Sequence, residues 1–547
     1  MKKIETDVII IGGGATGSGV LRDCTLRGIK AVLVEKDDIA SGTTGRNHGL
    51  LHSGARYATK DPVSAKECIA ENRILKKIAR HCIEDTGGLF VTLPEDDQGY
   101  HDMLVRDCLN AGIDCKEISI KDALRKEPNL NPSIRKALKV PDATIDPFRL
   151  AASNIMDSVE RGAVVFTHTE ITQLITNQNS LTGVRCFDRH RDENFEIYGK
   201  VTVNASGIWG QKICEPAGIG LKMYPSKGSM LIIDYRINNV VINRCRKPSS
   251  GDIFVPGDTV SLIGTTSKKI SYDIIDEPVV DDDEIKILLD EGEKLIPNVS
   301  KTRVLRAYCG IRPLVALSGN MDGRDISRGI ILIDHKESDG IENFITITGG
   351  KLMTYRLMAE KATNLVCKKL NIKKKCLTRK TPIPGSEKIF FNKRKLKPFQ
   401  GFSNSVVGST IYRHGTRAEQ ILQSNKKGSG LICECEMVTD REVKYAIDNQ
   451  LVKDIVDLRR RTRTGMGPCQ GGQCAYRSAG LFTEYGETKG EEAVKMLIDF
   501  LEERWKGVKP TLWGDSLREA EFTYWIYQGL FGIGNLTKGF GVKGKRE

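Results

Sequence analysis

The sequence lacks any long hydrophobic run and any strong excess of one charge sign. No window approaches the ~18 apolar residues of a membrane-spanning helix, and the best runs are only Val8–Ile11 and Ala31–Val34. The apolar run near the start is too short for a signal peptide and passes directly into a glycine turn, so we expect a mature intracellular N-terminus. The 83 Lys and Arg residues are interspersed with 70 Asp and Glu residues. A net charge of +13 suits an anionic ligand or a membrane surface and does not by itself indicate nucleic acid.

The composition is typical of a folded protein with several domains. Hydrophobic residues make up 39% and charged residues 28% of the 547 residues, which excludes a largely disordered chain. At roughly 100–200 residues per domain, this length predicts about three or four compact units. The fifteen cysteines are an odd number, and most are scattered, as is typical of buried thiols in a reducing compartment. The last four lie close together and need a separate explanation.

The N-terminal segment has the pattern of a dinucleotide-binding unit. Val8–Ile11 is a continuous apolar run, as in a parallel strand buried on both faces, and Ala31–Val34 is a second such run. A G-x-G-x-x-G turn and a helical stretch lie between them, and the glycines are Gly12, Gly14 and Gly17. The turn allows close approach of a pyrophosphate to the helix N-terminus, and Glu35 at the end of the second strand is placed to bind a ribose hydroxyl.

Three separated segments carry strand-and-turn patterns, which favours FAD over a nicotinamide cofactor. A nicotinamide enzyme typically continues with alternating βα units, whereas this chain continues with a long loop of small, donor-rich residues at Ser41–Tyr57. Further strand–turn patterns occur at Val201–Gly210, after a β-rich stretch from Val164, and at Phe344–Ala362. We therefore expect an α/β protein with a Rossmann-like FAD-binding fold of the glutathione-reductase type and an inserted, mainly β substrate domain.

The predicted boundaries divide the chain into four parts. The first is an FAD-dependent oxidoreductase domain at 1–385, with FAD-binding parts at about 1–89, 150–215 and 330–370 and substrate-domain insertions at about 90–149 and 216–329. A basic linker with a short helical segment follows at 386–430, then a small helical cysteine domain at 431–484 and a helical tail at 485–547. For the end of the tail, a docking role and simple disorder are equal alternatives.

The four C-terminal cysteines form two close pairs, Cys433-x-Cys435 and Cys469-x4-Cys474. Four thiolates on two loops, with glycines beside the second pair, are typical of a metal or iron–sulfur site. Zinc is the alternative, but glycine-rich loops supply backbone N–H donors to cluster sulfides, so we favour an iron–sulfur cluster. The arginine-rich run 459–463 is interpreted as a solvated face, and the alternative is contact with an acidic partner protein. Nucleic-acid binding has no supporting motif.

Six stretches of the sequence carry a family resemblance. They are VIIIGGGATGSG, TTGRNHGLLHSGARYA, INRCRKPSSGDIFVPGDTVSLIGTTS, LRAYCGIRPLV, FITITGGKLMTYRLMAEKA and RTRTGMGPCQGGQC. Together they resemble the FAD-dependent glycerol-3-phosphate dehydrogenases and, with the cysteines included, the large subunits of the anaerobic branch of that family. The cysteine region also resembles the domain of bacterioferritin-associated ferredoxin, which implies a [2Fe–2S] cluster. The second pair there is often C-x2-C, and the x4 spacing matches the version fused to this dehydrogenase family.

The resemblance implies roles for particular residues. Residues expected to bind FAD are Gly12, Gly14, Gly17, Glu35, Ser41, Thr44, Arg46, Asn47, His48, Gly49, Ala205, Gly207, Gly349 and Gly350. Those expected to contact substrate are Arg56, Tyr57 and Arg312, and further donors to flavin and substrate are Lys351, Thr354 and Arg356. The Gly349–Lys351 turn is expected to point free backbone N–H groups at the flavin edge where negative charge develops. His52 is the favoured base, with His48 and an arginine-assisted route as alternatives.

The same resemblance implies oxidation of glycerol 3-phosphate to dihydroxyacetone phosphate, with hydride passing to the flavin and electrons leaving through the cluster. It also implies two partner subunits, of which one is a second flavoprotein and the other is an iron–sulfur membrane anchor, with menaquinone as final acceptor. The chain itself would then be cytoplasmic and peripheral to the inner face of the cell membrane through these partners. Two alternatives are an oxidase of glycerol phosphate, amines or 2-hydroxy acids, which the cysteine domain opposes, and a non-enzymatic electron relay, which gives the substrate arginines no purpose.

Overall fold

The two apolar runs near the N-terminus form adjacent strands of a parallel sheet. β1 covers Lys2–Ile11, β2 covers Ala31–Val34, and helix α1, Ala15–Leu26, connects them. β1 is longer than the predicted run because its partly exposed first half pairs with β12, Glu193–Asn204. The second half of β1 is buried on both faces, as the continuous apolar run predicts.

Three strands that are far apart in the sequence become neighbours at the centre of this sheet. β20, Phe344–Gly349, pairs in parallel with the end of β12, and β12 pairs in parallel with β1. The remaining strands are β9 (Val164–Phe166), β10 (Thr169–Asn177), β11 (Ser180–Asp188) and β19 (Ile330–Asp334). Helix α1 packs against α5 (Pro147–Glu160) and α9 (Tyr355–Lys369). The carboxyl ends of β1, β12 and β20 therefore meet at one edge, which confirms that three segments return to one place.

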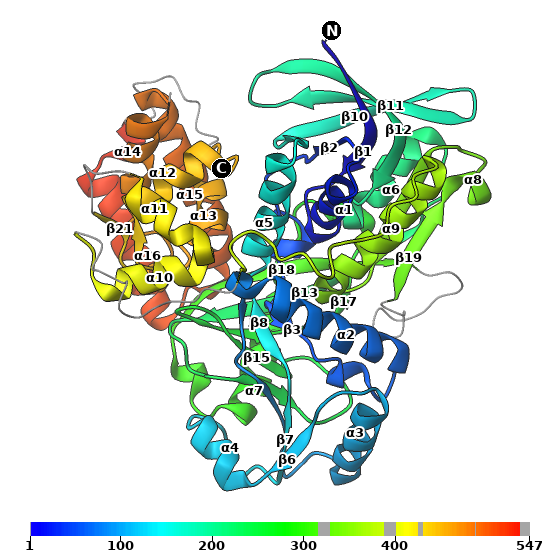
Figure 1. Ribbon diagram of the computed structural model, residues 1–547. Coiled ribbons are helices and arrows are strands. Elements are labelled where there is room, and N and C mark those ends of the chain that lie inside the picture. Colours follow the sequence, from blue (N-terminus) through cyan, green and yellow to red (C-terminus); the bar gives the residue numbers. More distant parts are fainter. Residues whose placement is uncertain (1, 316–328, 388–400, 425–429, 487, 536–547) are drawn as a thin grey trace.

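A second sheet of nine strands forms the lower part of the molecule in Figure 1. Its strands are β5 (Gly88–Thr92), β6 (Lys116–Ile118), β7 (Lys136–Val140), β13 (Met223–Ile233), β14 (Val241–Arg244), β15 (Ile253–Pro256), β16 (Ser261–Gly264), β17 (Lys268–Lys269) and β18 (Val304–Val315). Its helices are α3 (Gln98–Asn110), α4 (Ile120–Lys126) and α7 (Asp282–Leu295). The inserted domain is mainly β, as expected, but it also contains α3 and α4, which Asp97 and Ser119 cap.

Several elements lie along the chain between strands of the two sheets. They are β3 (Leu50–Leu51), β4 (Ile83–Glu84), β8 (Ala143–Ile145), α2 (Pro62–Ile78) and α6 (Gly210–Cys214). Helix α8 (His335–Ser338) connects β19 to β20 within the first sheet. β8 pairs with both β3 and β4, so the donor-rich loop predicted at Ser41–Tyr57 is tied through β3 to the first insertion.

The C-terminal part is a helical bundle with its own hydrophobic core, which includes Phe482, Leu497 and Phe500. Its elements are α10 (Asn404–His414), α11 (Ala418–Gln423), β21 (Leu431–Cys433), β22 (Val438–Thr439), α12 (Asp440–Asn449), α13 (Ile455–Thr462), α14 (Ala475–Tyr485), α15 (Gly490–Val508) and α16 (Gly514–Trp525). Figure 1 shows this bundle, coloured yellow to red, beside the two sheets.

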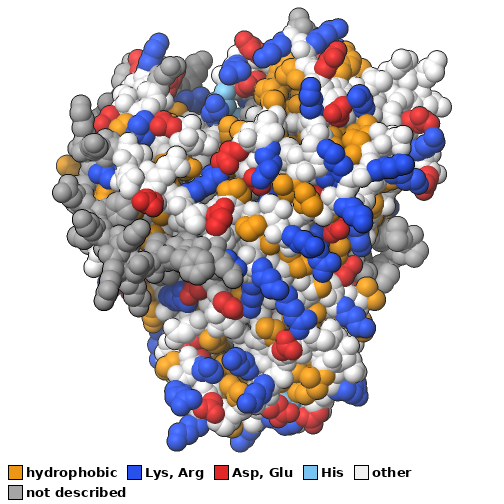
Figure 2. Space-filling view, in the orientation of Figure 1, with side chains coloured by type: hydrophobic (Ala, Val, Ile, Leu, Met, Phe, Trp, Pro, Cys, Tyr) orange, Lys and Arg blue, Asp and Glu red, His pale blue; other side chains and the backbone are white. Residues whose placement is uncertain are grey.

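The computed structural model describes residues 2–315, 329–387, 401–424, 430–486 and 488–535. Two stretches of the predicted linker, 388–400 and 425–429, and the last residues of the tail, 536–547, lie outside this range. None of the helices in the described part of the chain is long and apolar enough to span a membrane. Figure 2 shows Lys and Arg side chains intermixed with Asp and Glu over the visible face, as the interspersed charges of the sequence predict.

Candidate functional site

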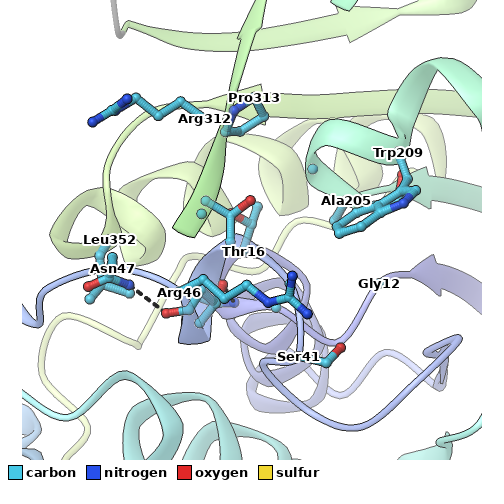
Figure 3. Close-up of a pocket in the computed structure, with 18 of the residues that line it drawn as sticks. Gly12, Thr16, Ser41, Arg46, Asn47, Ala205, Trp209, Arg312, Pro313 and Leu352 are labelled. Atoms are coloured by element: carbon cyan, nitrogen blue, oxygen red, sulfur yellow. Dashed lines mark hydrogen bonds between the residues drawn. The ribbon is translucent and has the colours of Figure 1, made fainter. Parts of the chain in front are cut away.

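A cavity of about 600 Å³ lies where the carboxyl ends of β1, β12 and β20 meet. The predicted cofactor residues that line it are Gly12, Gly14, Glu35, Ser41, Thr44, Arg46, Asn47, His48, Ala205, Gly207, Gly349 and Gly350. The predicted catalytic residues that line it are His52, Tyr57, Arg312 and Lys351. Figure 3 shows side chains from β18, from the loop after β2 and from the turn after β12 around this one space.

The glycine turn after β1 fits a dinucleotide pyrophosphate. Gly12 has φ +106°, and a Cβ there would lie 2.8 Å from the carbonyl oxygen of Ala205. A Cβ on Gly14 would lie 3.0 Å from the hydroxyl of Thr44, and α1 begins directly afterwards with no acidic side chain in its first turn. Gly17 does not line the cavity, because its Cα faces the carbonyl group of Gly12 and lets the helix pack closely on the turn.

Glu35 stands at the end of β2 and faces the cavity. Its carboxylate accepts hydrogen bonds from the backbone N–H of Gly13 at 2.6 Å and of Asp37 at 2.9 Å. Burial raises the pKa of Glu35 to about 6, against the lowering effect of these two bonds. Gly49, another predicted cofactor residue, lies outside this cavity. Its φ of +68° turns the loop where a Cβ would meet the carbonyl oxygen of Ile145 at 2.9 Å.

Aromatic and cationic side chains stand together on one side of the cavity. His52 is only 7% exposed, and its ring centroid lies 5.4 Å from that of Tyr57 and 5.9 Å from that of His48. The Nζ of Lys351 lies 4.5 Å from the ring centroid of Tyr57, which is a cation–π contact. The imidazole of His52 and the ammonium group of Lys351 therefore both contact the ring of Tyr57.

Arg312 projects from β18 and is held in one orientation. Its guanidinium donates to the hydroxyl of Thr265 at 2.8 Å, the carbonyl of Thr266 at 2.9 Å, the carbonyl of Lys227 at 3.2 Å and the hydroxyl of Ser226 at 3.3 Å. These four bonds hold the guanidinium of Arg312 at the wall of the cavity, where an anionic ligand can contact it.

Two predicted catalytic arginines are committed to carboxylates outside the cavity. Arg356 binds Glu71 through two nitrogens, at 2.6 and 2.7 Å, and also pairs with Glu360. Arg356 is 3% exposed, so the prediction that it is a donor to flavin or substrate was wrong. Arg56 binds Asp252 at 2.8 Å, although its Nη1 is buried without a hydrogen-bond partner.

The turn after β20 is also used differently from the prediction. The hydroxyl of Thr354 accepts from the N–H of Lys351 and donates to the carbonyl of the same residue, which makes it a cap for the short helical turn that follows. The N–H of Gly350 donates to the carbonyl of Gly329. The N–H groups of Gly350 and Lys351 are therefore not free for an anion, and positive charge at this edge comes from the Lys351 side chain. Gly349 and Gly350 are needed for their φ angles of +74° and +67°.

The four C-terminal thiols converge on one place in the bundle. Cys433 contacts Cys435 and Cys474, and Cys469 contacts the same two, so the four sulfurs form a closed ring. Hydrogen bonding among the four thiols holds the pKa values of Cys433 and Cys469 well below the usual thiol range and raises those of Cys435 and Cys474 well above it. A Cβ on Gly467 would lie 2.5 Å from the Cβ of Cys435, which explains the glycine beside the second pair.

The four thiols offer four sulfur ligands at one place, which suits a metal centre held by cysteine. Elsewhere in the described part of the chain, Asp38, His168 and Asp457 bring three metal-type ligand atoms within 4.8 Å of one another.

The arginine-rich run 459–463 holds the bundle against the sheets, which sequence reasoning missed. Arg461, 1% exposed at its side chain, binds both carboxylate oxygens of Asp38, and Arg460 binds Asp38 at 3.0 Å. Arg463 pairs with Asp258 at 2.6 Å. The prediction of a solvated face was therefore wrong for these three residues, because their acidic partners belong to the same chain and lie hundreds of residues away.

Comparison with known proteins gives a consistent result. The family described as FAD dependent oxidoreductase matches residues 7–356, and the family described as BFD-like [2Fe-2S] binding domain matches residues 431–484. The chain is 54% identical over 529 residues to an anaerobic glycerol-3-phosphate dehydrogenase subunit of Escherichia coli (strain K12), covering 97% of each chain. It is 39% identical over 539 residues to the anaerobic glycerol-3-phosphate dehydrogenase subunit A1 of Haloferax volcanii, covering 96% of this chain and 90% of that one.

A solved structure has the same fold. The glycerol-3-phosphate dehydrogenase from Bacillus halodurans, determined in complex with FAD, aligns with a TM-score of 0.71 and 23% identity. The alignment covers 93% of this chain and 96% of that chain. The shared fold therefore extends over the cavity-bearing sheets and most of the C-terminal part.

Proposed function

The chain belongs to the FAD-dependent oxidoreductase family and, within it, to the anaerobic glycerol-3-phosphate dehydrogenase subunits, and from this premise we propose that it oxidises sn-glycerol 3-phosphate to dihydroxyacetone phosphate. The observation that carries the proposal is the similarity to the Escherichia coli protein over 97% of both chains, which takes in both the cavity and the cysteines. When bound, FAD accepts the hydride of the substrate alcohol and a [2Fe–2S] cluster passes electrons on singly.

The cavity supplies what this reaction needs from the protein. His52 accepts the proton of the substrate hydroxyl, because it is a buried imidazole that lines the cavity. Arg312, which also lines the cavity, binds the phosphate dianion. Arg56 supports the site from outside the cavity, where it is paired with Asp252. Lys351 places positive charge where negative charge develops during hydride transfer. Tyr57 orients Lys351 through their cation–π contact.

The cofactor-binding roles follow the same geometry. Gly12 and Gly14 leave room for the pyrophosphate at the start of α1, and Glu35 binds a ribose hydroxyl. The thiolates that hold the cluster are those of Cys433, Cys435, Cys469 and Cys474. Because the relatives are named as one subunit of their enzyme, the chain works with other subunits. We assign these to a second flavoprotein and to an iron–sulfur membrane anchor that delivers electrons to menaquinone, which places the chain at the inner face of the cell membrane.

One anaerobic experiment tests the substrate assignment. The FAD-loaded protein is mixed with glycerol 3-phosphate, glycerol, lactate or sarcosine, and the flavin absorbance is followed. Only glycerol 3-phosphate should bleach the flavin, because only it carries the phosphate that Arg312 recognises. Bleaching by lactate or sarcosine alone would assign the chain to another substrate class, and no bleaching by any of them would leave an electron-relay function. The role of His52 is tested with His52→Asn, which should lower the rate of bleaching and flatten its dependence on pH.

A further inference from the structure

A second cavity, of about 730 Å³, has no part in the proposed reaction. It shares Ser41, Arg46, Asn47 and His48 with the first cavity, so this loop is a wall between the two. Its other walls come from β18 of the second sheet and from α13 and α15 of the C-terminal bundle. The cavity thus lies where the three parts of the molecule meet, and its volume is within the range of about 300–1,000 Å³ that is usual for small-molecule sites.

Two guanidinium groups line this cavity, and each has an Nε atom that is buried without a hydrogen-bond partner. They belong to Arg306 of β18, which is 8% exposed, and to Arg459 of α13, which is half-buried. Burial lowers the pKa of Arg306 and of Arg459, and the charge of Arg306 lowers that of Arg459 further. The negative charge of Glu503 raises the pKa of both Arg306 and Arg459. The ion pair of Glu503, however, is with Lys506, at 3.3 Å.

The other acidic side chains that line the cavity do not form ion pairs with Arg306 or Arg459. Asp258 pairs with Arg149 and Arg463, and Asp276 pairs with Lys212. The other acidic side chains of the wall are Asp146, which also pairs with Arg149 and Arg463, and the exposed Glu277 and Asp282. Because burying unbalanced guanidinium groups is costly, the part of the cavity that Arg306 and Arg459 line is a site built for an anion.

The strand β18 connects the two cavities physically. Alternate residues of a strand lie on one face, so Arg306, Tyr308, Gly310 and Arg312 share a face. Arg312 lines the first cavity and Arg306 the second. Between them, Tyr308 donates a hydrogen bond to the carbonyl of Asn47 at 2.9 Å, and Gly310 leaves room for the backbone of Arg46.

We propose that the second cavity binds a small phosphate ester with an aromatic or other apolar body. The phosphate lies between Arg306 and Arg459, whose guanidinium groups line the cavity and supply charge-assisted hydrogen bonds. The body lies against the apolar wall formed by Phe148, Val255, Val260, Leu262, Tyr308 and Pro510. The site is separate from the substrate phosphate site at Arg312, so the ligand binds whether or not the first cavity is occupied.

Calorimetric titration of the FAD-loaded protein tests this proposal. The probe is adenosine 5′-monophosphate, which has a phosphate and an aromatic body, and adenosine is its neutral counterpart. The monophosphate should bind the wild type and adenosine should not. The double variant Arg306→Gln/Arg459→Gln should weaken binding of the monophosphate at least about tenfold, because it removes two charged donors. Arg312→Gln should leave this binding unchanged, which separates the second cavity from the first.

Two further variants keep the test decisive. Glu503→Gln removes the acid that acts on both arginines and should tighten binding of the monophosphate, so the proposal can be judged even where the double variant fails to fold. Arg185→Gln, on the β10–β11 hairpin and outside both cavities, is the matched control and should bind as the wild type does. Unchanged affinity in the double variant, or unchanged or weaker affinity in Glu503→Gln, would overturn the proposal, as would the absence of binding to the wild type.

Discussion

The flavin cavity and the junction between the bundle and the sheets are built in opposite ways. The cavity is formed mainly by backbone turns at strand ends, where Gly12 and Gly349 adopt positive φ angles. The junction is formed by long side chains, with Arg461 bound to Asp38 and Arg463 bound to Asp258. A site made from backbone turns depends on a few neighbouring residues, whereas an ion-pair junction depends on partners that only the fold brings together. Variants in each region should therefore fail in different ways.

The largest effect is expected from Cys469→Ser, which removes one thiolate from the ring. A serine hydroxyl is a poor ligand for iron at neutral pH, so we expect iron and sulfide to fall from about two of each per chain to near zero. Bleaching of the flavin by glycerol 3-phosphate should persist, because the cavity lies in the other part of the molecule. Cys115→Ser, at a half-buried thiol far from the ring in sequence, is the control and should keep its iron. Zinc in place of iron in the wild type would contradict the cluster assignment.

The second effect concerns the junction and is expected in Arg461→Met. Asp38 and Arg461 have side chains 0% and 1% exposed, and removal of one partner from such a buried pair costs about 3–5 kcal/mol. Urea unfolding followed by tryptophan fluorescence should show this loss. The double variant Asp38→Leu/Arg461→Met should recover much of it, since no buried charge is left unpaired. Arg189→Met breaks the exposed pair with Asp37 and should cost no more than about 1 kcal/mol.

The pH dependence of that loss follows from the pKa of Asp38. Burial acts to raise this pKa, but the charges of Arg461 and Arg460 outweigh it and hold it at about 2. Because the folded pKa lies below the ordinary value of about 3.9, the contribution of Asp38 is fully present above about pH 4 and is lost only as the pH falls through about 2. The wild-type pair should therefore contribute equally at pH 6 and pH 8. In Arg461→Met, burial acts on Asp38 against the charge of Arg460 alone, so the pKa of Asp38 should rise and the cost of the substitution should be smaller at pH 6 than at pH 8. A cost that did not fall between pH 8 and pH 6 would show that ionised Asp38 is not what makes the variant unstable.

The contrast between the two regions also explains what the sequence could predict. Ala31–Val34 was predicted as a strand and is β2, because a continuous apolar run is visible within four residues. The four C-terminal cysteines were predicted to share one site, because two close pairs of the same ligand type are visible in the sequence. The structural role of Arg356 was not predictable, since its partner Glu71 lies 285 positions away on α2 and nothing near Arg356 indicates it. The helices α3 and α4 were not predicted, because strand-like alternation of apolar residues dominated the reading of this segment. Their capping residues, Asp97 and Ser119, are the local signal that could have indicated them.

The third effect tests the backbone turn and is expected in Gly12→Ala. The new Cβ would lie 2.8 Å from the carbonyl oxygen of Ala205 and would occupy space needed for the pyrophosphate. We expect FAD affinity to fall by about 100-fold, since both strain and lost contacts act at one point. Gly162→Ala is a close control, because Gly162 also has a positive φ, +91°, but has nothing within 4 Å of a new Cβ. It should lose about 1–2 kcal/mol of stability and bind FAD as tightly as the wild type.

The smallest effect is expected in the apoprotein of Glu35→Gln. Burial raises the pKa of Glu35 to about 6, above its ordinary value of about 4.3. The folded state therefore holds this proton more tightly than the unfolded state, so the stabilising contribution of Glu35 is present at low pH and is lost as the pH rises through about 6. Glutamine does not titrate, so the melting temperature of the variant, relative to the wild type, should improve between pH 5 and pH 8. A difference in melting temperature that stayed constant across this range would show that burial does not destabilise the ionised form of Glu35.

Glu35→Gln should also bind FAD more weakly at pH 8, because the charged carboxylate is the stronger acceptor for a ribose hydroxyl. In contrast to the junction, where carboxylates gain stability from their charge, the flavin cavity gives up stability in order to keep a charged acceptor available for its ligand.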